Sequence, residues 1–369
     1  MARLTFYPIG NADCCVIESG NRVVLFDYAN MRTGEPGDLR IDLEAAVRGK
    51  LKELGRDSVD VLALTHLDQD HIKGAHVLFK FEHAEEHQQD GSIGIDELWV
   101  PAAMLLETGV EDDARVVRQE ARYRLKQGRG IRVFSRPAVL ADWLAENGLS
   151  IDDRRDCFVD AGQLVPTFSL GADGVEFFVH SPFASRLDGG EPIDRNTDAI
   201  FVQATLCVDG EETKILLGAD ADHDVLAQIV DITRYHGRES RLEWDIFELP
   251  HHCSYLSLGP HKGDDSTQPV ENVAWLFEEQ SRQKPIIVST SDPIPYDDTV
   301  QPPHRQAANY YRELVKGRSG QFLVTMEHPS RANPGPLVIE IDGTGGRITG
   351  LLGPTAVLTT AGRPAPKVG

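Results

Sequence analysis

The sequence predicts an α/β protein in which two β-sheets form a sandwich and helices lie outside them. Short apolar runs alternate with segments of helical periodicity through two comparable halves of the chain. Aspartates and histidines recur directly after several apolar runs, where loops held by a rigid sheet place functional side chains. With 369 residues, 41% of them hydrophobic, the chain is long enough for one large domain or two ordinary ones.

The N-terminal part is a series of short strands followed by a helix. We expect strands at residues 4–9, 14–18 and 22–26, and the last two form a hairpin through a Ser-Gly-Asn turn. Apolar residues at helical spacing predict a helix over residues 42–54, and Gly55 ends it.

The apolar run at residues 59–64 predicts a buried strand, and the loop after it carries the strongest functional signal. Four side chains of metal-binding type stand there within six positions: His66, Asp68, Asp70 and His71. Imidazole with carboxylate suits Zn²⁺, and more carboxylate favours Mn²⁺ or Fe. Because four ligands from so short a stretch cannot crowd onto one ion, we expect two adjacent ions, one served by each half of the loop.

Residues 80–165 differ from their surroundings and are interpreted as a mainly helical insertion that borders the site. A predicted strand and two predicted helices lie at residues 95–100, 103–127 and 138–148. His83 and His87 are four residues apart and could bind a metal ion. We favour the alternative, two surface histidines in an acidic loop.

Strands resume after the insertion. They are predicted at residues 175–179, 199–208, 213–217, 244–249, 286–290, 322–325 and 337–341. Helices are predicted at residues 270–279 and 304–315. We interpret residues 1–353 as a single domain, and residues 354–369, rich in Pro, Thr and Ala, as a frayed tail.

More candidate ligands follow strands elsewhere in the chain. They are Asp27, His180, Asp220, His251 and His252. Side chains on loops held by a rigid sheet form the preorganised kind of site that metal chemistry needs.

The ordered set of motifs resembles the metallo-β-lactamase superfamily, and within it the hydrolase domain of ComEC-type competence proteins. Residues 66–71 read His-x-Asp-x-Asp-His where the family usually has His-x-His-x-Asp-His. Residues 10–13 resemble the Gly-Gln-Gly-Asp opening of that branch, and residues 250–254 resemble its His-His-Gly-Ser segment. The resemblance covers roughly residues 1–345 and implies a four-layer αββα sandwich.

The resemblance also implies a role for each ligand. The first metal ion would be bound by His66, Asp68 and His180, although His180 could instead be a half-buried histidine at a strand end. The second would be bound by Asp70, His71 and one of His251 and His252, with Asp220 bridging the two ions. We prefer His252 as the ligand, because His-x-Ser recurs around it in related nucleases. His251 could equally be the ligand or a substrate contact. Asp27 would orient the His66 loop.

Three further residues depart from the pattern or extend it. Lys73 stands where the branch usually has glycine, and its charge would bind a phosphate or pair with a carboxylate. Cys253 replaces glycine, and its thiolate would perturb the metal site. His304, which opens a predicted helix, would contact substrate, protonate a leaving group or be structural. The expected catalytic residues are Asp70, Asp220, His304 and Lys73.

Composition limits the partners and the compartment. The formal charge of −21 repels phosphate backbones, so free nucleic acid is not attracted at long range. The five cysteines lack framework spacing, which indicates free thiols in a reducing compartment. No signal peptide or membrane span is apparent, and we expect a cytoplasmic protein.

The expected function is that of a metal-dependent hydrolase in which two divalent ions, Zn²⁺ or Mn²⁺, activate water. A phosphodiesterase or nuclease is the first hypothesis, acting on a nucleotide or on nucleic acid presented by a partner protein. A lactonase or β-lactamase-type carbonyl hydrolase is the second. The third is an effector or interaction subunit of a multi-protein system.

Overall fold

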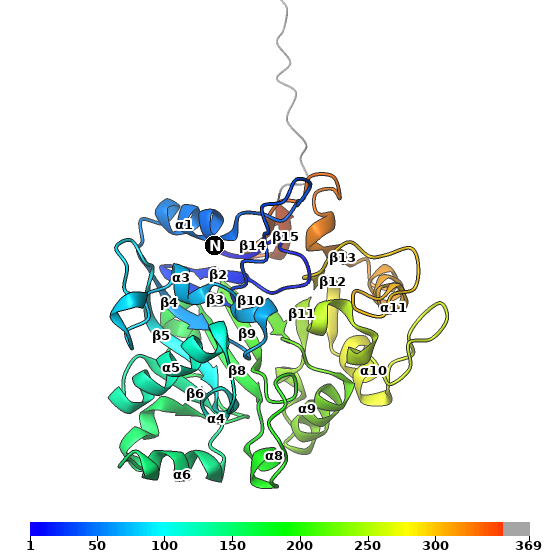
Figure 1. Cartoon of the computed structure of the whole chain (residues 1–369). Helices are drawn as coiled ribbons and strands as arrows, with labels where there is room; N and C mark the ends of the chain where they lie inside the picture. Colours follow the sequence, from blue (N-terminus) through cyan, green and yellow to red (C-terminus); the bar gives the residue numbers. More distant parts are fainter. Residues whose placement is uncertain (350–369) are drawn as a thin grey trace, which may run out of the picture.

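The structure is a computed structural model that describes residues 1–349. Two sheets lie against each other with helices on both outer sides (Figure 1), which confirms the predicted α/β sandwich. The predicted tail at residues 354–369 and the domain end at residue 353 lie outside the described residues. Among the described residues, no helix has both the length and the apolar character needed to cross a bilayer.

The first sheet has nine strands in the order β15-β14-β1-β2-β3-β4-β5-β6-β7. Their bounds are β1 Ala2–Phe6, β2 Cys15–Ser19, β3 Arg22–Phe26, β4 Ser58–Ala63, β5 Gly94–Pro101, β6 Ile131–Phe134, β7 Phe158–Val159, β14 Leu337–Asp342 and β15 Gly345–Thr349. The hairpin of β2 and β3 is antiparallel as predicted, and β3 to β7 are parallel. Parallel β3 and β4 therefore end at the same edge of the sheet.

The second sheet has six strands in the order β13-β12-β11-β10-β9-β8. Their bounds are β8 Val175–Ser181, β9 Phe201–Val208, β10 Glu211–Leu217, β11 Trp244–Glu248, β12 Ser281–Ser289 and β13 Gln321–Val324. Strands β10 to β13 are parallel, so β10 and β11 also end at a common edge.

Helices cover the outer face of each sheet. The α-helices are α1 Leu43–Glu53, α2 Gln69–Ile72, α3 Ala75–Leu78, α4 Ala102–Leu106, α5 Asp112–Gln127, α6 Ala138–Glu146, α7 Leu170–Asp173, α8 Ala184–Asp188, α9 His223–Tyr235, α10 Glu271–Glu278 and α11 Arg305–Gly317. In Figure 1, α1 and α3 to α6 lie on one side of the molecule and α9 to α11 on the other. The segment 80–165 holds α4 to α6 and also adds β5, β6 and β7 to the first sheet.

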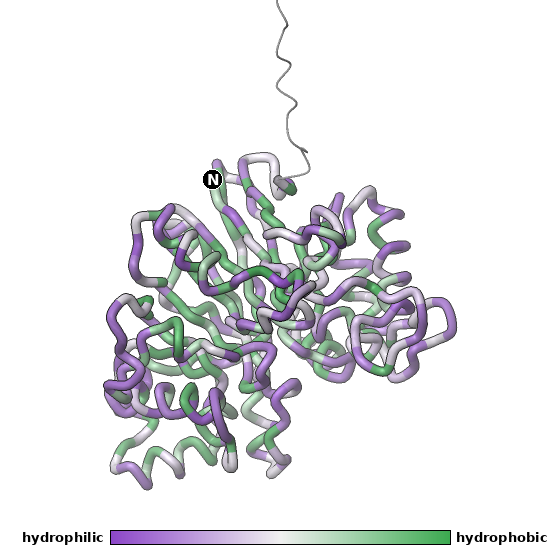
Figure 2. The backbone as a smooth tube through the Cα atoms, turned by 45° about the horizontal axis from the view of Figure 1, so that its top comes forward, coloured by the Kyte–Doolittle hydropathy of each residue, from purple (hydrophilic) through white to green (hydrophobic). Residues whose placement is uncertain are grey.

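Three apolar cores hold the four layers together. One lies under α1 and α3 to α6, one lies between the sheets, and one lies under α9 to α11. Figure 2 shows hydrophobic residues gathered along the interior strands and hydrophilic residues on the outer loops. Burial of this apolar surface, at about 25 cal/mol per Å², makes the sheets a rigid support for the loops at their edges.

Candidate metal centre

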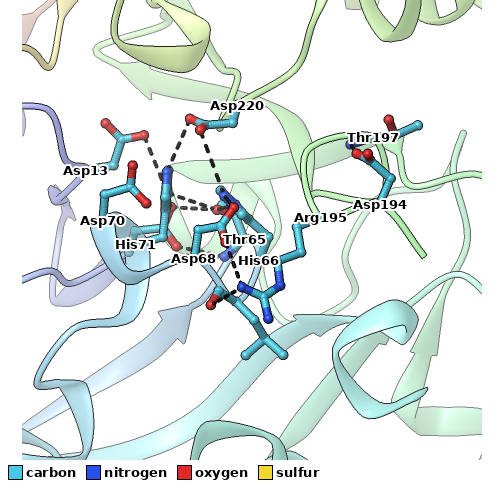
Figure 3. A network of polar contacts seen from close by, with 12 residues as sticks. Asp13, Thr65, His66, Asp68, Asp70, His71, Asp194, Arg195, Thr197 and Asp220 are labelled. Atoms are coloured by element: carbon cyan, nitrogen blue, oxygen red, sulfur yellow. Dashed lines mark hydrogen bonds and ion pairs between the residues drawn. The ribbon is translucent and has the colours of Figure 1, made fainter. Parts of the chain in front are cut away.

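Four strands, two from each half of the chain, end at the same edge of the sandwich. The segments that follow them carry the candidate ligands. Asp27 follows β3, the His66 loop follows β4, Asp220 follows β10 and His252 follows β11. Figure 3 shows Asp220 above His66 and His71, with its carboxylate directed towards both rings. Residues predicted as ligands from distant parts of the sequence therefore share one site.

Four of the predicted ligands form a tight group. The ligand atoms of Asp70, His71, Asp220 and His252 all lie within 4.8 Å of one another. His71 Nε2 lies 3.2 Å from Asp220 Oδ1, and His252 Nε2 lies 3.7 Å from the same oxygen. His252 Nε2 also lies 3.2 Å from Asp70 Oδ2. Two imidazoles and two carboxylates form a donor set that suits a divalent ion such as Zn²⁺.

A second, looser group lies on the other side of Asp220. His66 Nε2 is 3.4 Å from Asp68 Oδ2 and 4.0 Å from Asp220 Oδ2. Asp220 thus directs Oδ1 towards His71 and His252 and Oδ2 towards His66. This is the orientation that a carboxylate shared by two ions requires.

The buried polar atoms of the cluster fit bound cations. His66 Nε2, His71 Nε2 and Asp220 Oδ1 are buried and have no hydrogen-bond partner among the described residues. Leaving such atoms unpaired costs about 1–3 kcal/mol each. Since all three belong to the predicted ligand set, a metal ion is the partner that their chemistry calls for.

Hydrogen bonds behind the rings fix their orientation. His71 donates from Nδ1 to Asp27 Oδ2 at 2.8 Å, and Asp13 Oδ2 lies 3.6 Å from the same nitrogen. The Thr65 hydroxyl donates to Asp27 at 2.6 Å and lies 3.1 Å from His66 Nδ1, so that ring donates to Thr65. Each ring is left with Nε2 facing the cluster. Asp27 therefore orients the loop, as expected, in the way that outer carboxylates orient metal-binding histidines.

His252 is held in the same way from the second sheet. Its Nδ1 donates to the carbonyl oxygen of Thr290 at 2.9 Å, which turns Nε2 towards Asp70 and Asp220. The geometry therefore places His252, and not His251, in the position of a ligand.

The charges of the cluster depend strongly on one another. Burial lowers the pKa of His252, but the carboxylates of Asp220 and Asp13 outweigh burial and raise that pKa to about 9. Burial opposes ionisation of Asp220 too, yet the neighbouring His71 and His252 hold its pKa well below the usual range. The pKa of His71 lies well above its usual value, because Asp220 and Asp27 outweigh burial. Binding of a cation would release protons from these rings.

Backbone strain gathers at the same place. Five of the ten non-glycine residues with left-handed φ in residues 1–349 adjoin the cluster: Asp27, Ala219, His251, His252 and Cys253. Each such residue costs on the order of 1–3 kcal/mol and persists only where the surroundings enforce it. Gly218 allows the turn before Asp220, since a Cβ there would lie 2.7 Å from Pro250 Cγ.

Arg195 is a site residue that the sequence analysis missed. It lies in the loop before β9 and donates from Nη1 to Asp68 Oδ1 at 2.7 Å and to the Leu67 carbonyl oxygen at 3.2 Å. Its Nε and Nη2 bind the Glu107 carboxylate at 2.6 to 3.0 Å. Because most of its donors are used, Arg195 holds Asp68 in place rather than offering a free charge to a substrate. Figure 3 shows it beside Asp68.

His180 does not join the cluster, which corrects its predicted ligand role. Its Nε2 donates to the carbonyl oxygen of Arg241 at 2.9 Å, and its ring packs on Phe201. It lines a pocket against α9, on the outer side of the second sheet. Burial lowers the pKa of His180 to about 4, so the ring is neutral.

His304 and Cys253 are also turned to structural uses. His304 accepts the Tyr255 N–H at Nδ1 and donates from Nε2 to the Val300 carbonyl oxygen, both at 3.3 Å. With both ring nitrogens bonded to backbone, it has no free atom for a leaving group. Cys253 is fully buried, and burial raises its pKa to about 12. The expected thiolate is therefore absent at neutral pH.

Lys73 and His251 are the remaining two residues that the sequence analysis singled out. The charge of Lys73 helps to lower the pKa of Asp113 on α5, after the larger effect of His76. This is the smallest of the contributions that act on Asp113, so both roles expected of Lys73, binding a phosphate and pairing with a carboxylate, remain predictions. His251 is half-buried with a buried Nδ1 that has no partner among the described residues. Burial lowers the pKa of His251, so its ring is neutral beside the cluster.

Asp222, two residues after Asp220, is the N-cap of α9. Its side chain accepts the N–H groups of Asp224 and Val225 and caps α9. Asp13, by contrast, was noted only as part of a motif. Its carboxylate forms a second group with Asp27 and His71, whose ligand atoms lie within 4.8 Å of one another. Asp13 lies in the loop between β1 and β2, and no hydrophobic periodicity there predicts its position.

Comparison with known proteins gives only distant structural similarity. No family model and no curated protein sequence matches the chain. A metallo hydrolase from Ignicoccus hospitalis, Igni18, is similar in structure, with a TM-score of 0.39 and 11% identity over 92% of this chain and 98% of that chain. The metallo-β-lactamase fold protein YhfI from Bacillus subtilis has a TM-score of 0.42 and 11% identity over 91% of this chain and 98% of its own. A diphosphatase of the PhnP family has a TM-score of 0.39 and 9% identity over 93% and 98%. At these scores nothing about the function of the chain follows from them.

Proposed function

We propose that the chain is a metal-dependent hydrolase with two divalent ions, Zn²⁺ or Mn²⁺, and that it cleaves phosphoesters, phosphodiesters first among them. The orientation of Asp220 carries the proposal, because its two oxygens face separate ligand groups. Paired ions when bound would polarise the substrate and lower the pKa of a water molecule. The ordered motifs, rather than any structural similarity, support the ComEC-like branch.

Hydrogen bonds from neighbouring residues fix the candidate ligands in these positions. Asp27 and Thr65 fix the two rings of the β4 loop, and Thr290 fixes His252. His251, neutral and half-buried, has a ring nitrogen without a partner among the described residues and would offer a ring N–H to a phosphoryl oxygen of the substrate. His180 and His304, whose ring nitrogens are bonded to backbone carbonyl and N–H groups, have no part in the proposed reaction.

The substrate class follows from charge and donor type. Asp68 makes the site richer in oxygen than the usual His-rich loop, which favours phosphoryl chemistry. The net charge of −21 opposes binding of naked duplex, so a nucleotide, or nucleic acid presented by a partner protein, fits better. All five cysteines are free, which agrees with the proposed cytoplasmic location.

A substrate panel tests the proposal. The protein, loaded with Zn²⁺ or with Mn²⁺, is assayed on bis-p-nitrophenyl phosphate, single-stranded DNA and a lactone, beside the Asp220→Ala variant. Phosphodiester turnover that the variant loses is the expected result. Turnover of the lactone alone would replace this proposal with the carbonyl hydrolase. No turnover at full metal occupancy would favour the interaction subunit.

A further inference from the structure

Three histidines gather against α5, apart from the candidate metal centre. His76 lies on α3, His87 ends the 3₁₀ turn Glu85–His87, and His83 lies just before that turn. The ring centroids of His76 and His87 are 5.2 Å apart, and those of His83 and His87 are 5.1 Å apart. The His87 ring therefore stands between the other two.

This spacing is that of imidazoles that share an ion. A Zn–N bond of about 2.0–2.1 Å and tetrahedral geometry put the centroids of two imidazole ligands about 5 Å apart. In the candidate metal centre, the two rings that would share an ion, His71 and His252, have centroids 5.7 Å apart.

Carboxylates lie close to two of the three rings. His83 Nδ1 donates to Glu120 Oε2 at 3.0 Å. Asp113 Oδ1 lies 2.7 Å from His76 Nδ1 but not in line for a hydrogen bond. A carboxylate at one ring nitrogen is the usual companion of a metal-binding histidine, since it orients the ring and makes the other nitrogen a better donor. Glu120 is itself buried and is held by Arg124 at 2.6 Å. Both carboxylates lie on α5, which gives the cluster a rigid base.

The rings are accessible enough to take up an ion. The side chains of His76, His83 and His87 are 24%, 10% and 12% exposed. His83 and His87 are therefore partly buried at the surface rather than fully exposed. Within residues 1–349, no hydrogen bond engages Nε2 of His76 or of His83. His76 and His83 in turn lower the pKa of His87, after the larger effect of burial, so His87 is available as a neutral donor.

We propose that His76, His83 and His87 bind a third divalent transition-metal ion, with Zn²⁺ as the reference ion and water completing the site. The ligand atoms of the three rings do not all lie within 4.8 Å of one another, so rotation of the side chains draws them onto the ion. The ion ties residues 76–87 to α5. This site uses none of the residues of the proposed hydrolase and does not depend on that function.

Zinc content after equilibrium dialysis against buffered ZnCl₂ tests the site. His87→Ala is compared with its parent in two backgrounds, the natural chain and Asp220→Ala. The exposed His261 lies outside both clusters, so His261→Ala is the matched control. We expect His87→Ala to remove one zinc per chain in both backgrounds and His261→Ala to remove none. Equal zinc content in His87→Ala and its parent would overturn the proposal. Loss of hydrolysis in Asp220→Ala reports on the proposed function alone, so the two failures are distinguishable.

A second variant tests the carboxylate behind His76. Asp113→Asn keeps the shape of the side chain and is expected to weaken zinc binding by about 10- to 100-fold at this site, while the count at saturating zinc is unchanged. An unchanged affinity would show that Asp113 does not support a ligand. Circular dichroism of each variant shows that it is folded before its zinc is counted.

Discussion

The two sides of Asp220 differ in how the protein holds their ligands. On one side, Asp70, His71 and His252 join Asp220 within 4.8 Å, and both rings are buried. On the other side, Asp68 is 37% exposed and depends on an arginine from a distant loop. The first side is preorganised by the sheets, while the second is held by a surface ion pair. We therefore expect the first side to bind its ion more tightly and the second to exchange its ion more readily.

Removing Asp220, the carboxylate that we propose bridges the two ions, should have the largest effect on turnover, because both proposed ion sites would lose a ligand. We expect Asp220→Ala to lower turnover by about 10³-fold, on the scale of losing a preorganised charge-stabilising group. The matched control is Asp222→Asn, since asparagine also caps a helix and Asp222 bonds only to α9 among the described residues. Steady-state hydrolysis and metal content are measured together. Full metal content and activity in Asp220→Ala would show that no ion is shared.

Variants of His251 and His252 should distinguish a metal ligand from a residue that contacts the substrate. His252→Ala should lose the tighter ion and about 10²-fold in turnover, a loss of the size that a missing preorganised group causes. His251→Ala should keep both ions and lose about tenfold in kcat, the value of one neutral hydrogen bond. Metal analysis beside kinetics decides between the two roles. If His251→Ala lost the ion and His252→Ala kept it, the ligand assignment would be reversed.

The positions of the candidate ligands at strand ends were predictable, because an apolar run marks where a strand stops. Asp27, the His66 loop, Asp220 and His252 all follow runs whose ends the structure confirms within a residue or two. His180 follows the same rule but lies on the outer side of β8, towards α9. Which face a strand's last residues present is set by the pleat and by packing, and a continuous apolar run does not reveal it.

Arg195 could not be predicted for a different reason. It lies in an irregular loop, and its partners Asp68 and Glu107 are 127 and 88 residues away in sequence. No period links residues so far apart. The ring nitrogens of His304 were equally beyond reach, because backbone groups of neighbouring loops use them.

Removing the charge of Arg195 should weaken metal binding on the Asp68 side of Asp220 only. In Arg195→Met, Asp68 loses the charge that holds it, and we expect the affinity of the weaker ion to fall by about 10- to 100-fold. Glu107→Gln should act in the same direction with a smaller effect. Metal titration against a chelator resolves the two ions, and excess metal should restore kcat in both variants. Equal weakening of both ions would contradict the difference drawn between the two sides.

The pH dependence of metal affinity should differ between the two sides of Asp220, because the raised pKa values belong to His71 and His252 on the tighter side. Each ring must lose its Nε2 proton to bind metal. Below the His252 pKa of about 9, we expect the affinity of the tighter ion to rise up to about tenfold per pH unit for each proton released. Calorimetry in buffers of different ionisation enthalpy counts those protons.

In protein stripped of metal by a chelator, His71 and His252 should make the stability of the fold decrease as the pH rises. A histidine whose pKa is raised by folding stabilises the fold fully below its unfolded value of about 6.5, and this stabilisation is lost as pH rises through the folded value. The thermal unfolding temperature of chelated protein should therefore fall between about pH 7 and pH 9, the window set by the His252 pKa of about 9. His252→Gln should show a shallower fall, since it lacks one of the two titrating rings. A temperature that rose with pH in chelated protein would mean that the carboxylates around Asp220 do not hold these protons.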